Sequence, residues 1–127
     1  MTIAYWCVLV AALLPYPWVL AAKASPRYNN YSPRDYLARQ SGWRQRAHWA
    51  HLNTLEAFPL FAVAVVIAQQ LHVQQESLDR LALAFIGLRL AYGLVYIANI
   101  AWLRSLVWFA ALGCCVAMFL LAAGITL

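Results

Sequence analysis

Two stretches of otherwise apolar sequence carry polar side chains at helical spacing. The first stretch places three of them within an arc of about 80° on a helix: Arg46, Asn53 and Glu56. The second places three within about 60°: Arg89, Tyr92 and Tyr96. Guanidinium groups bind carboxylates through forked hydrogen bonds, while amide and carboxylate groups bind amides and amines. The two faces therefore predict a polar pocket for a ligand that carries both carboxylates and amide or amine groups.

A second interpretation of these residues is purely structural. A charged side chain at mid-bilayer costs roughly 2.5–3.5 kcal/mol on insertion scales, so the charges found there usually face a helix bundle or a cavity. Glu56 and Arg89 carry opposite charges. They could neutralise each other and hold two helices together without any ligand.

The rest of the chain has the composition of a membrane protein. Of its 127 residues, 65% are apolar and 10% are charged, whereas soluble domains carry roughly 45–50% apolar and about 25% charged residues. The apolar residues gather in four stretches of about twenty, the length that an α-helix needs to cross a hydrocarbon core of about 30 Å. The sequence predicts one all-α membrane domain over residues 1–127, with transmembrane helices at about 3–22, 47–68, 81–103 and 106–127. No room is left for a soluble catalytic domain.

The helix boundaries rest on a few polar or proline residues. Pro15 and Pro17 are expected to kink the first span, and Arg104 and Ser105 are expected to form a tight turn between the last two spans. The first stretch could also be a signal peptide, because a small-residue pattern surrounds Lys23. Its length and the lack of a preceding basic residue favour a transmembrane helix.

Six of the nine basic residues lie in the connection over residues 23–46, with only Asp35 to oppose them. They are Lys23, Arg27, Arg34, Arg39, Arg44 and Arg46. The positive-inside rule places this connection in the cytoplasm and, with four spans, both termini outside. Beside a membrane, the anionic lipid leaflet is a better partner for such a loop than nucleic acid.

The histidines and cysteines do not predict a metal site or a disulfide. His48 and His51 are spaced to face one ion, but no further ligand stands at a matching distance in the sequence. Cys7, Cys114 and Cys115 all fall in apolar stretches. We therefore expect neither a bound metal nor a structural disulfide.

The run from Arg46 to Phe61 closely resembles the second-helix signature of the MAPEG family, the membrane-associated proteins in eicosanoid and glutathione metabolism. That signature has an arginine, an asparagine seven residues later, an acidic residue three further on and then a proline after three more, and all four positions match, the last at Pro59. Arg89, Tyr92 and Tyr96 are similar to the family's third-helix pattern. Arg104 falls about where the family places an arginine at the start of its fourth helix, so the resemblance covers essentially the whole chain.

The resemblance implies a bacterial-type member in the inner membrane, assembled as a homotrimer. Glutathione would be the co-substrate, bound between neighbouring subunits near the cytoplasmic face, and the second partner a lipophilic small molecule. The residues implied to bind glutathione are Arg46, Asn53, Glu56, Arg89, Tyr92 and Tyr96. Arg104 is implied to be the catalytic cation near the sulfur, where a fixed guanidinium favours the thiolate.

Two functions remain open at this point. Trp49 stands where several glutathione-using members have an arginine, and Ala57 where some have a tyrosine. The family also includes a non-catalytic, arachidonate-presenting protein with the same second-helix spacing. The chain is thus expected to be either a glutathione-dependent transferase or peroxidase acting on a lipophilic electrophile or lipid hydroperoxide, or a non-catalytic lipid-binding membrane scaffold of the same fold. A small channel is disfavoured, because the apolar runs of the first and fourth spans carry no charge.

Overall fold

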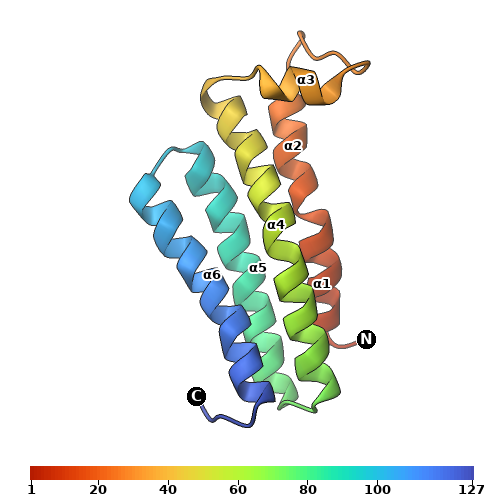
Figure 1. Cartoon of the computed structure of the whole chain (residues 1–127), viewed down its shortest axis with the longest axis vertical. Helices are drawn as coiled ribbons and strands as arrows, with labels where there is room; N and C mark the ends of the chain where they lie inside the picture. Colours follow the sequence, from red (N-terminus) through yellow and green to blue (C-terminus); the bar gives the residue numbers. More distant parts are fainter.

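The computed structural model describes all 127 residues and contains helices and no strands. The helices are α1 (Ile3–Leu13), α2 (Pro15–Lys23), α3 (Pro33–Ala38), α4 (Gly42–Gln70), α5 (Gln75–Ile97) and α6 (Ala101–Ala122). Four segments are long and apolar enough to cross a membrane: Ile3–Lys23, Gly42–Gln70, Gln75–Ile97 and Ala101–Ala122. They form an elongated bundle, and α3 lies across one of its ends (Figure 1). The predicted all-α membrane bundle with four spans is confirmed.

The first span is broken in its middle, as predicted from its prolines. Helix α1 ends at Leu13 and α2 begins at Pro15, because the proline ring removes a backbone donor and clashes with the preceding turn. No break occurs at Pro17, which lies within α2. Ala4 and Cys7 of α1 are buried against the rest of the bundle. The first apolar stretch is thus an integral part of the helix packing.

The other three spans begin earlier than the apolar stretches suggest. Helix α4 starts at Gly42 instead of 47, and α5 starts at Gln75 instead of 81. The first turns of α5 are polar, but Gln75 donates to Asp79 at 2.8 Å and Arg80 pairs with Glu76. Such pairs one turn apart stabilise a helix, so α5 extends beyond its apolar part. Hydropathy detects only the apolar part and therefore places the start of the helix too late.

The prediction of a turn at Arg104 and Ser105 is wrong. Helix α5 ends at Ile97, and α6 already begins at Ala101, so both polar residues lie inside α6. The turn occupies residues 98–100, where Asn99 has a left-handed φ of 63°. Asparagine adopts this conformation more readily than most residues. The turn around Asn99, and not Arg104, thus separates the last two spans.

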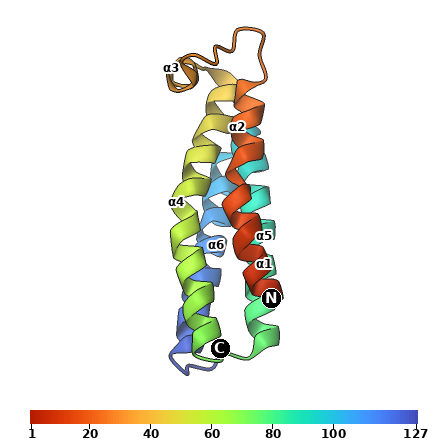
Figure 2. The same cartoon turned by 90° about the vertical axis from the view of Figure 1, so that its right-hand side faces the viewer.

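Two clusters of buried apolar side chains hold the bundle. The larger one joins α1, α4, α5 and α6, with Phe61 and Phe85 stacked at 4.0 Å between ring centroids. The smaller one lies under α3 and includes Tyr36 and Leu37. Both termini lie at the end of the bundle away from α3 (Figures 1 and 2). The arrangement brings the 23–46 connection and the α5–α6 turn to the other end, as four spans require.

Candidate functional site

Arg89 lies at the centre of the candidate site, on α5. Its side chain is 2% exposed and its guanidinium stacks 4.2 Å above the Tyr92 ring. One terminal nitrogen, Nη2, donates to Asn53 Oδ1 at 2.8 Å and to Thr54 Oγ1 at 3.4 Å. The Nε atom is buried and has no hydrogen-bond partner. The partners of Arg89 on α4 are therefore neutral, and part of its donor capacity is unused.

No carboxylate of the chain forms an ion pair with Arg89. The ion pairs of the structure join Arg39 to Asp35 and Arg80 to Glu76, all on the surface. Glu56 is exposed about halfway along α4. A buried cation without a counter-charge costs several kcal/mol, so the bundle itself does not account for Arg89. Glu56 and Arg89 therefore do not form the ion pair that a purely structural role within the chain would require.

A pair of tyrosines links Arg89 to a second arginine. Tyr92 and Tyr96 meet edge to face, with ring centroids 5.6 Å apart, and the guanidinium of Arg104 lies 4.6 Å above the Tyr96 ring. Trp49 of α4 closes the same side, 6.4 Å from Tyr96. Aromatic faces attract cations. Each of the two tyrosine rings therefore has one guanidinium stacked on it. Both arginines belong to one continuous face of α5 and α6.

Three adjoining hollows share Asn53 as a lining residue. The largest, of about 370 Å³, is open and partly polar, and its lining consists of Trp49, Leu52, Asn53, Glu56, Tyr92 and Tyr96. A smaller one, of about 120 Å³, brings in α6 through Arg104, Ser105, Trp108 and Phe109. We call these two together the polar groove. It presents an exposed carboxylate, an amide, two phenols and a guanidinium to the same space.

The third hollow is an apolar pocket of about 160 Å³ between α4, α5 and α6. Its walls include Leu60, Phe85 and Leu112 together with the buried Arg89, and it shares Glu56 with the polar groove. An apolar chamber next to a polar groove can hold a lipophilic group beside a charged one. The arrangement thus offers two chemically different compartments that meet at Asn53 and Glu56.

Arg46 is the predicted ligand residue that lines none of these hollows. Its Nε donates to the backbone carbonyl of Ile97 at 3.0 Å, so it satisfies an acceptor at the C-terminal end of α5. The other predicted site residues do line the hollows. Arg46 therefore fixes the end of the helix that carries Tyr96.

Trp108 and Ser105 are site residues that the sequence reasoning missed. Trp108 lines both the apolar pocket and the polar groove. Ser105 was expected in a turn but faces the polar groove from α6. Arg104, Trp108 and Cys115 are spaced four and seven residues apart, which places them on one helical face. That pattern becomes visible only when α6 is known to start before Arg104.

His48 and His51 belong to a different surface of α4. Their rings stack at 6.1 Å, and His51 Nδ1 lies 3.1 Å from the carbonyl oxygen of Pro15. This contact joins α4 to the first residue of α2. The structure gathers no three histidine, cysteine, aspartate or glutamate side chains around a common point, and the three cysteines are free thiols.

Comparison with known proteins gives one match. The model of the MAPEG family matches residues 3–124, nearly the whole chain. No curated protein and no solved structure matches it significantly. The matched range includes all four spans and every residue of the polar groove and the apolar pocket.

Proposed function

Because the chain belongs to the MAPEG family, we propose that it is a glutathione-dependent transferase or peroxidase that acts on a lipophilic electrophile or lipid hydroperoxide. The family includes glutathione transferases, peroxidases and other members, so membership permits this activity without selecting it. The selection rests on the chemistry of the polar groove.

The observation that carries the proposal is the buried, unneutralised guanidinium of Arg89 beside an exposed carboxylate. Glutathione is an acidic tripeptide with two carboxylates, an ammonium group and two amides. Arg89 is suited to one carboxylate, Glu56 to the ammonium group and Asn53 to an amide. A ligand of this kind supplies both the anion that Arg89 lacks and the cation that Glu56 lacks.

Arg104 and Tyr96 are proposed to act on the sulfur. Bound glutathione would supply the nucleophilic sulfur. In conjugation an S–C bond would form as the leaving group of the electrophile departs, and in peroxide reduction the O–O bond would break, the alcohol would leave and a second glutathione would complete the disulfide. The Arg104 guanidinium, held above Tyr96 at 4.6 Å, favours the thiolate over the thiol through its fixed charge. The apolar pocket, with Leu60, Phe85 and Leu112 in its wall, is proposed to receive the lipophilic partner from the membrane side.

We also propose that the active form is a homotrimer in the bacterial inner membrane. The exposed position of Glu56 midway along a membrane-spanning helix supports the trimer, because a carboxylate facing lipid is unfavourable and a neighbouring subunit can enclose it. The proposed orientation places the 23–46 connection in the cytoplasm and both termini outside. The excess of basic residues in that connection supports it.

Glutathione titration of the detergent-purified protein tests the function. We expect saturable binding together with an ultraviolet absorbance that reports the thiolate at a pH where free glutathione remains mostly protonated. Binding without the thiolate signal would instead favour the lipid-binding scaffold, whose apolar pocket needs no thiol chemistry. No binding at all would remove glutathione from the proposal.

Replacement of Glu56 by glutamine should weaken glutathione binding at least about tenfold and leave stability almost unchanged. The expected loss corresponds to a charge-assisted hydrogen bond of about 1.5–3 kcal/mol. Stability should change by less than about 0.5 kcal/mol, because the exposed Glu56 pairs with no cation in the subunit. The measurements are glutathione titration and thermal unfolding of the same preparations.

Glu76→Gln is the matched control for this substitution. Glu76 is an exposed carboxylate that pairs with Arg80 at the first turn of α5, and it lines none of the three hollows. The Glu76→Gln substitution should leave glutathione affinity unchanged. A Glu56→Gln protein with strongly reduced stability but normal affinity would assign Glu56 to bundle packing instead.

A further inference from the structure

The basic end of the bundle holds all of the excess charge of the chain. Residues 23–46 contain six basic residues and one acidic residue, a net charge of +5. The rest of the chain contains three basic and three acidic residues and is neutral. Two of the arginines at this end already have structural contacts, because Arg44 donates to the Ala24 carbonyl at 2.9 Å and Arg46 to that of Ile97 at 3.0 Å. These two contacts leave four basic residues of this connection: Lys23, Arg27, Arg34 and Arg39.

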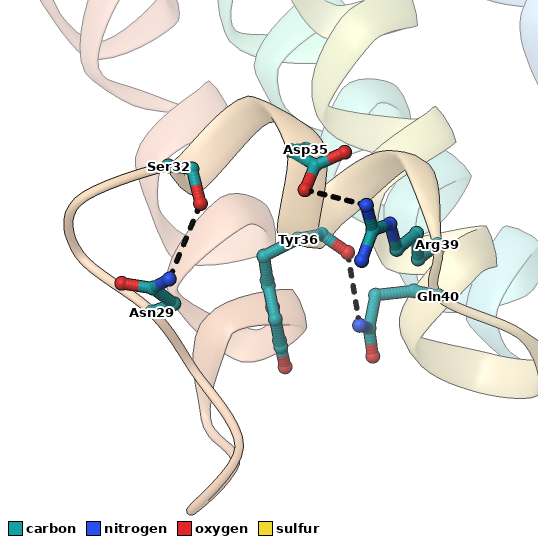
Figure 3. Close-up of polar contacts among 6 residues, drawn as sticks. All are labelled: Asn29, Ser32, Asp35, Tyr36, Arg39 and Gln40. Atoms are coloured by element: carbon teal, nitrogen blue, oxygen red, sulfur yellow. Dashed lines mark hydrogen bonds and ion pairs between the residues drawn. The ribbon is translucent and has the colours of Figure 1, made fainter.

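A hollow of about 380 Å³ lies between α3 and the loop that precedes it. We call it the loop pocket. Its lining is almost entirely polar and consists of Arg27, Asn29, Ser32, Asp35, Tyr36, Arg39 and Gln40. Figure 3 shows Asn29 and Ser32 on one side of Tyr36, with Arg39 and Gln40 on the other. The loop pocket is therefore lined by polar side chains from both α3 and the loop before it.

The walls of the loop pocket are fixed by the fold. Tyr36 is buried, and its hydroxyl donates to the Ala22 carbonyl at 3.2 Å, which ties α3 to α2. On the loop side, Asn29 Nδ2 donates to Ser32 Oγ at 3.3 Å, and Asn29 Oδ1 accepts from the Tyr31 amide at 3.0 Å. Gln40 Nε2 donates to the Tyr36 carbonyl at 3.0 Å. The hollow is thus preformed, which lowers the entropic cost of ligand binding.

The charges around the loop pocket leave one guanidinium unopposed. Arg39, which lines the hollow, pairs with Asp35 at 3.0 Å (Figure 3). Arg27 forms no ion pair. With two arginines and one aspartate, the lining carries a net charge of +1. Guanidinium groups bind phosphate oxygens through paired hydrogen bonds, so the lining suits a phosphate.

We propose that the loop pocket binds the phosphate of an anionic lipid head group. Helix α2 ends at Lys23 and α4 begins at Gly42, so the loop between these two spans lies at head-group depth. Tyr31, at the outer face of that loop, is 100% exposed, and tyrosine is enriched at membrane interfaces. The loop pocket shares no residue with the polar groove. The proposal is therefore independent of glutathione chemistry.

The test uses the full chain in a neutral detergent at physiological ionic strength. Dihexanoylphosphatidylglycerol is titrated, and bound lipid is counted by native mass spectrometry. We expect one saturable site per subunit, with dihexanoylphosphatidylcholine bound at least about tenfold more weakly. Arg27→Gln and Arg39→Gln should each weaken phosphatidylglycerol binding about tenfold, the loss expected for a hydrogen bond to a charged group.

Two control variants distinguish lipid binding in the loop pocket from non-specific electrostatic attraction between the anionic lipid and the basic residues. Arg34→Gln removes the same charge from the same connection, but Arg34 does not line the hollow, so affinity should fall less than about twofold. Arg80→Gln removes an arginine with the same kind of ion pair and nearly the same side-chain exposure as Arg39, 77% against 76%, and should have no effect.

Three results would overturn the proposal. Equal losses with Arg34→Gln and Arg39→Gln would show diffuse electrostatic attraction without a defined site. Equal affinity for phosphatidylcholine would show that the anionic character of the head group is not recognised. Displacement of phosphatidylglycerol by inorganic phosphate at comparable concentration would assign the loop pocket to a soluble phosphate instead of a lipid.

Discussion

Arg104→Ala should lower the rate of glutathione conjugation to a model electrophile about hundredfold, the effect of removing one preorganised donor at a developing negative charge. The thiolate absorbance of bound glutathione should disappear with it. Glutathione affinity should fall less than the rate, because the guanidinium interacts most strongly once the thiolate has formed. Stopped-flow turnover and thiolate absorbance, measured on the same preparation, give both quantities.

The placement of Arg104 is difficult to explain by helix stability alone. It lies in the first turn of α6, where the helix dipole disfavours a positive charge. Its guanidinium stacks on Tyr96 and lines the polar groove beside Asn53 and Tyr92. The protein therefore holds a cation at an unfavourable position and directs it toward the space where an anionic sulfur is proposed to bind.

The Arg104→Lys substitution distinguishes a catalytic role of Arg104 from a role in membrane anchoring. Arg104 stands near the end of a span, where a basic side chain can also anchor the helix by reaching the lipid head groups. An anchor tolerates lysine with nearly full activity, whereas loss of the planar guanidinium should cost roughly tenfold in rate. Arg80→Ala, at the opposite end of α5, is the control that should retain full activity. Turnover and thiolate absorbance that survive in Arg104→Ala would move the catalytic role to Tyr96.

Gly93→Ala should destabilise the bundle by about 3 kcal/mol or more, at the upper end of the range for overpacked cores. A methyl group at this position would meet the indole ring of Trp18 at 2.2 and 2.3 Å. The ring belongs to α2 and is almost fully buried, so it has no free space to move into. Relief of the clash requires α2 to separate from α5. Unfolding in increasing concentrations of a denaturing detergent measures the loss.

Gly87→Ala provides the control within the same helix. No atom lies within 4 Å of the position that its Cβ would occupy, and alanine is the better helix former by roughly 1 kcal/mol. This variant should be at least as stable as the original chain. Equal stability of the two variants would contradict the close approach of α2 and α5 at Gly93, and with it the observed packing of Trp18.

Composition and local spacing were enough to predict the architecture and to group most residues of the candidate site. Four apolar stretches predicted the four spans, because hydrocarbon thickness sets the length of a spanning helix. Pro15 predicted the break in the first span. Helical spacing placed Asn53 with Glu56, and both line the same hollows. It also placed Arg89 with Tyr92, and the Arg89 guanidinium stacks on the Tyr92 ring. Each of these properties is local to a single helix, so it can be predicted from the sequence of that helix alone.

The contacts between helices were not available from the same reasoning. Arg89 bonds Asn53 and Thr54 where an ion pair with Glu56 was an open alternative, and Arg46 bonds the Ile97 carbonyl. Both outcomes depend on how far α5 is shifted and rotated against α4. Those relative positions come from packing over the whole bundle, and side-chain periodicity within one helix does not specify them.

Local sequence thus determined which residues share a helical face, and tertiary structure decided what each of them meets there. Asn99 shows the difference at the end of α5: its left-handed φ of 63° places Arg104 inside α6, facing Tyr96 and the polar groove. Gly93 shows it in the middle, where the missing side chain lets Trp18 approach the helix backbone. The physical reason is that hydropathy and helical period are short-range properties, whereas partners, hollows and unneutralised charges arise only when several helices pack at one fixed offset.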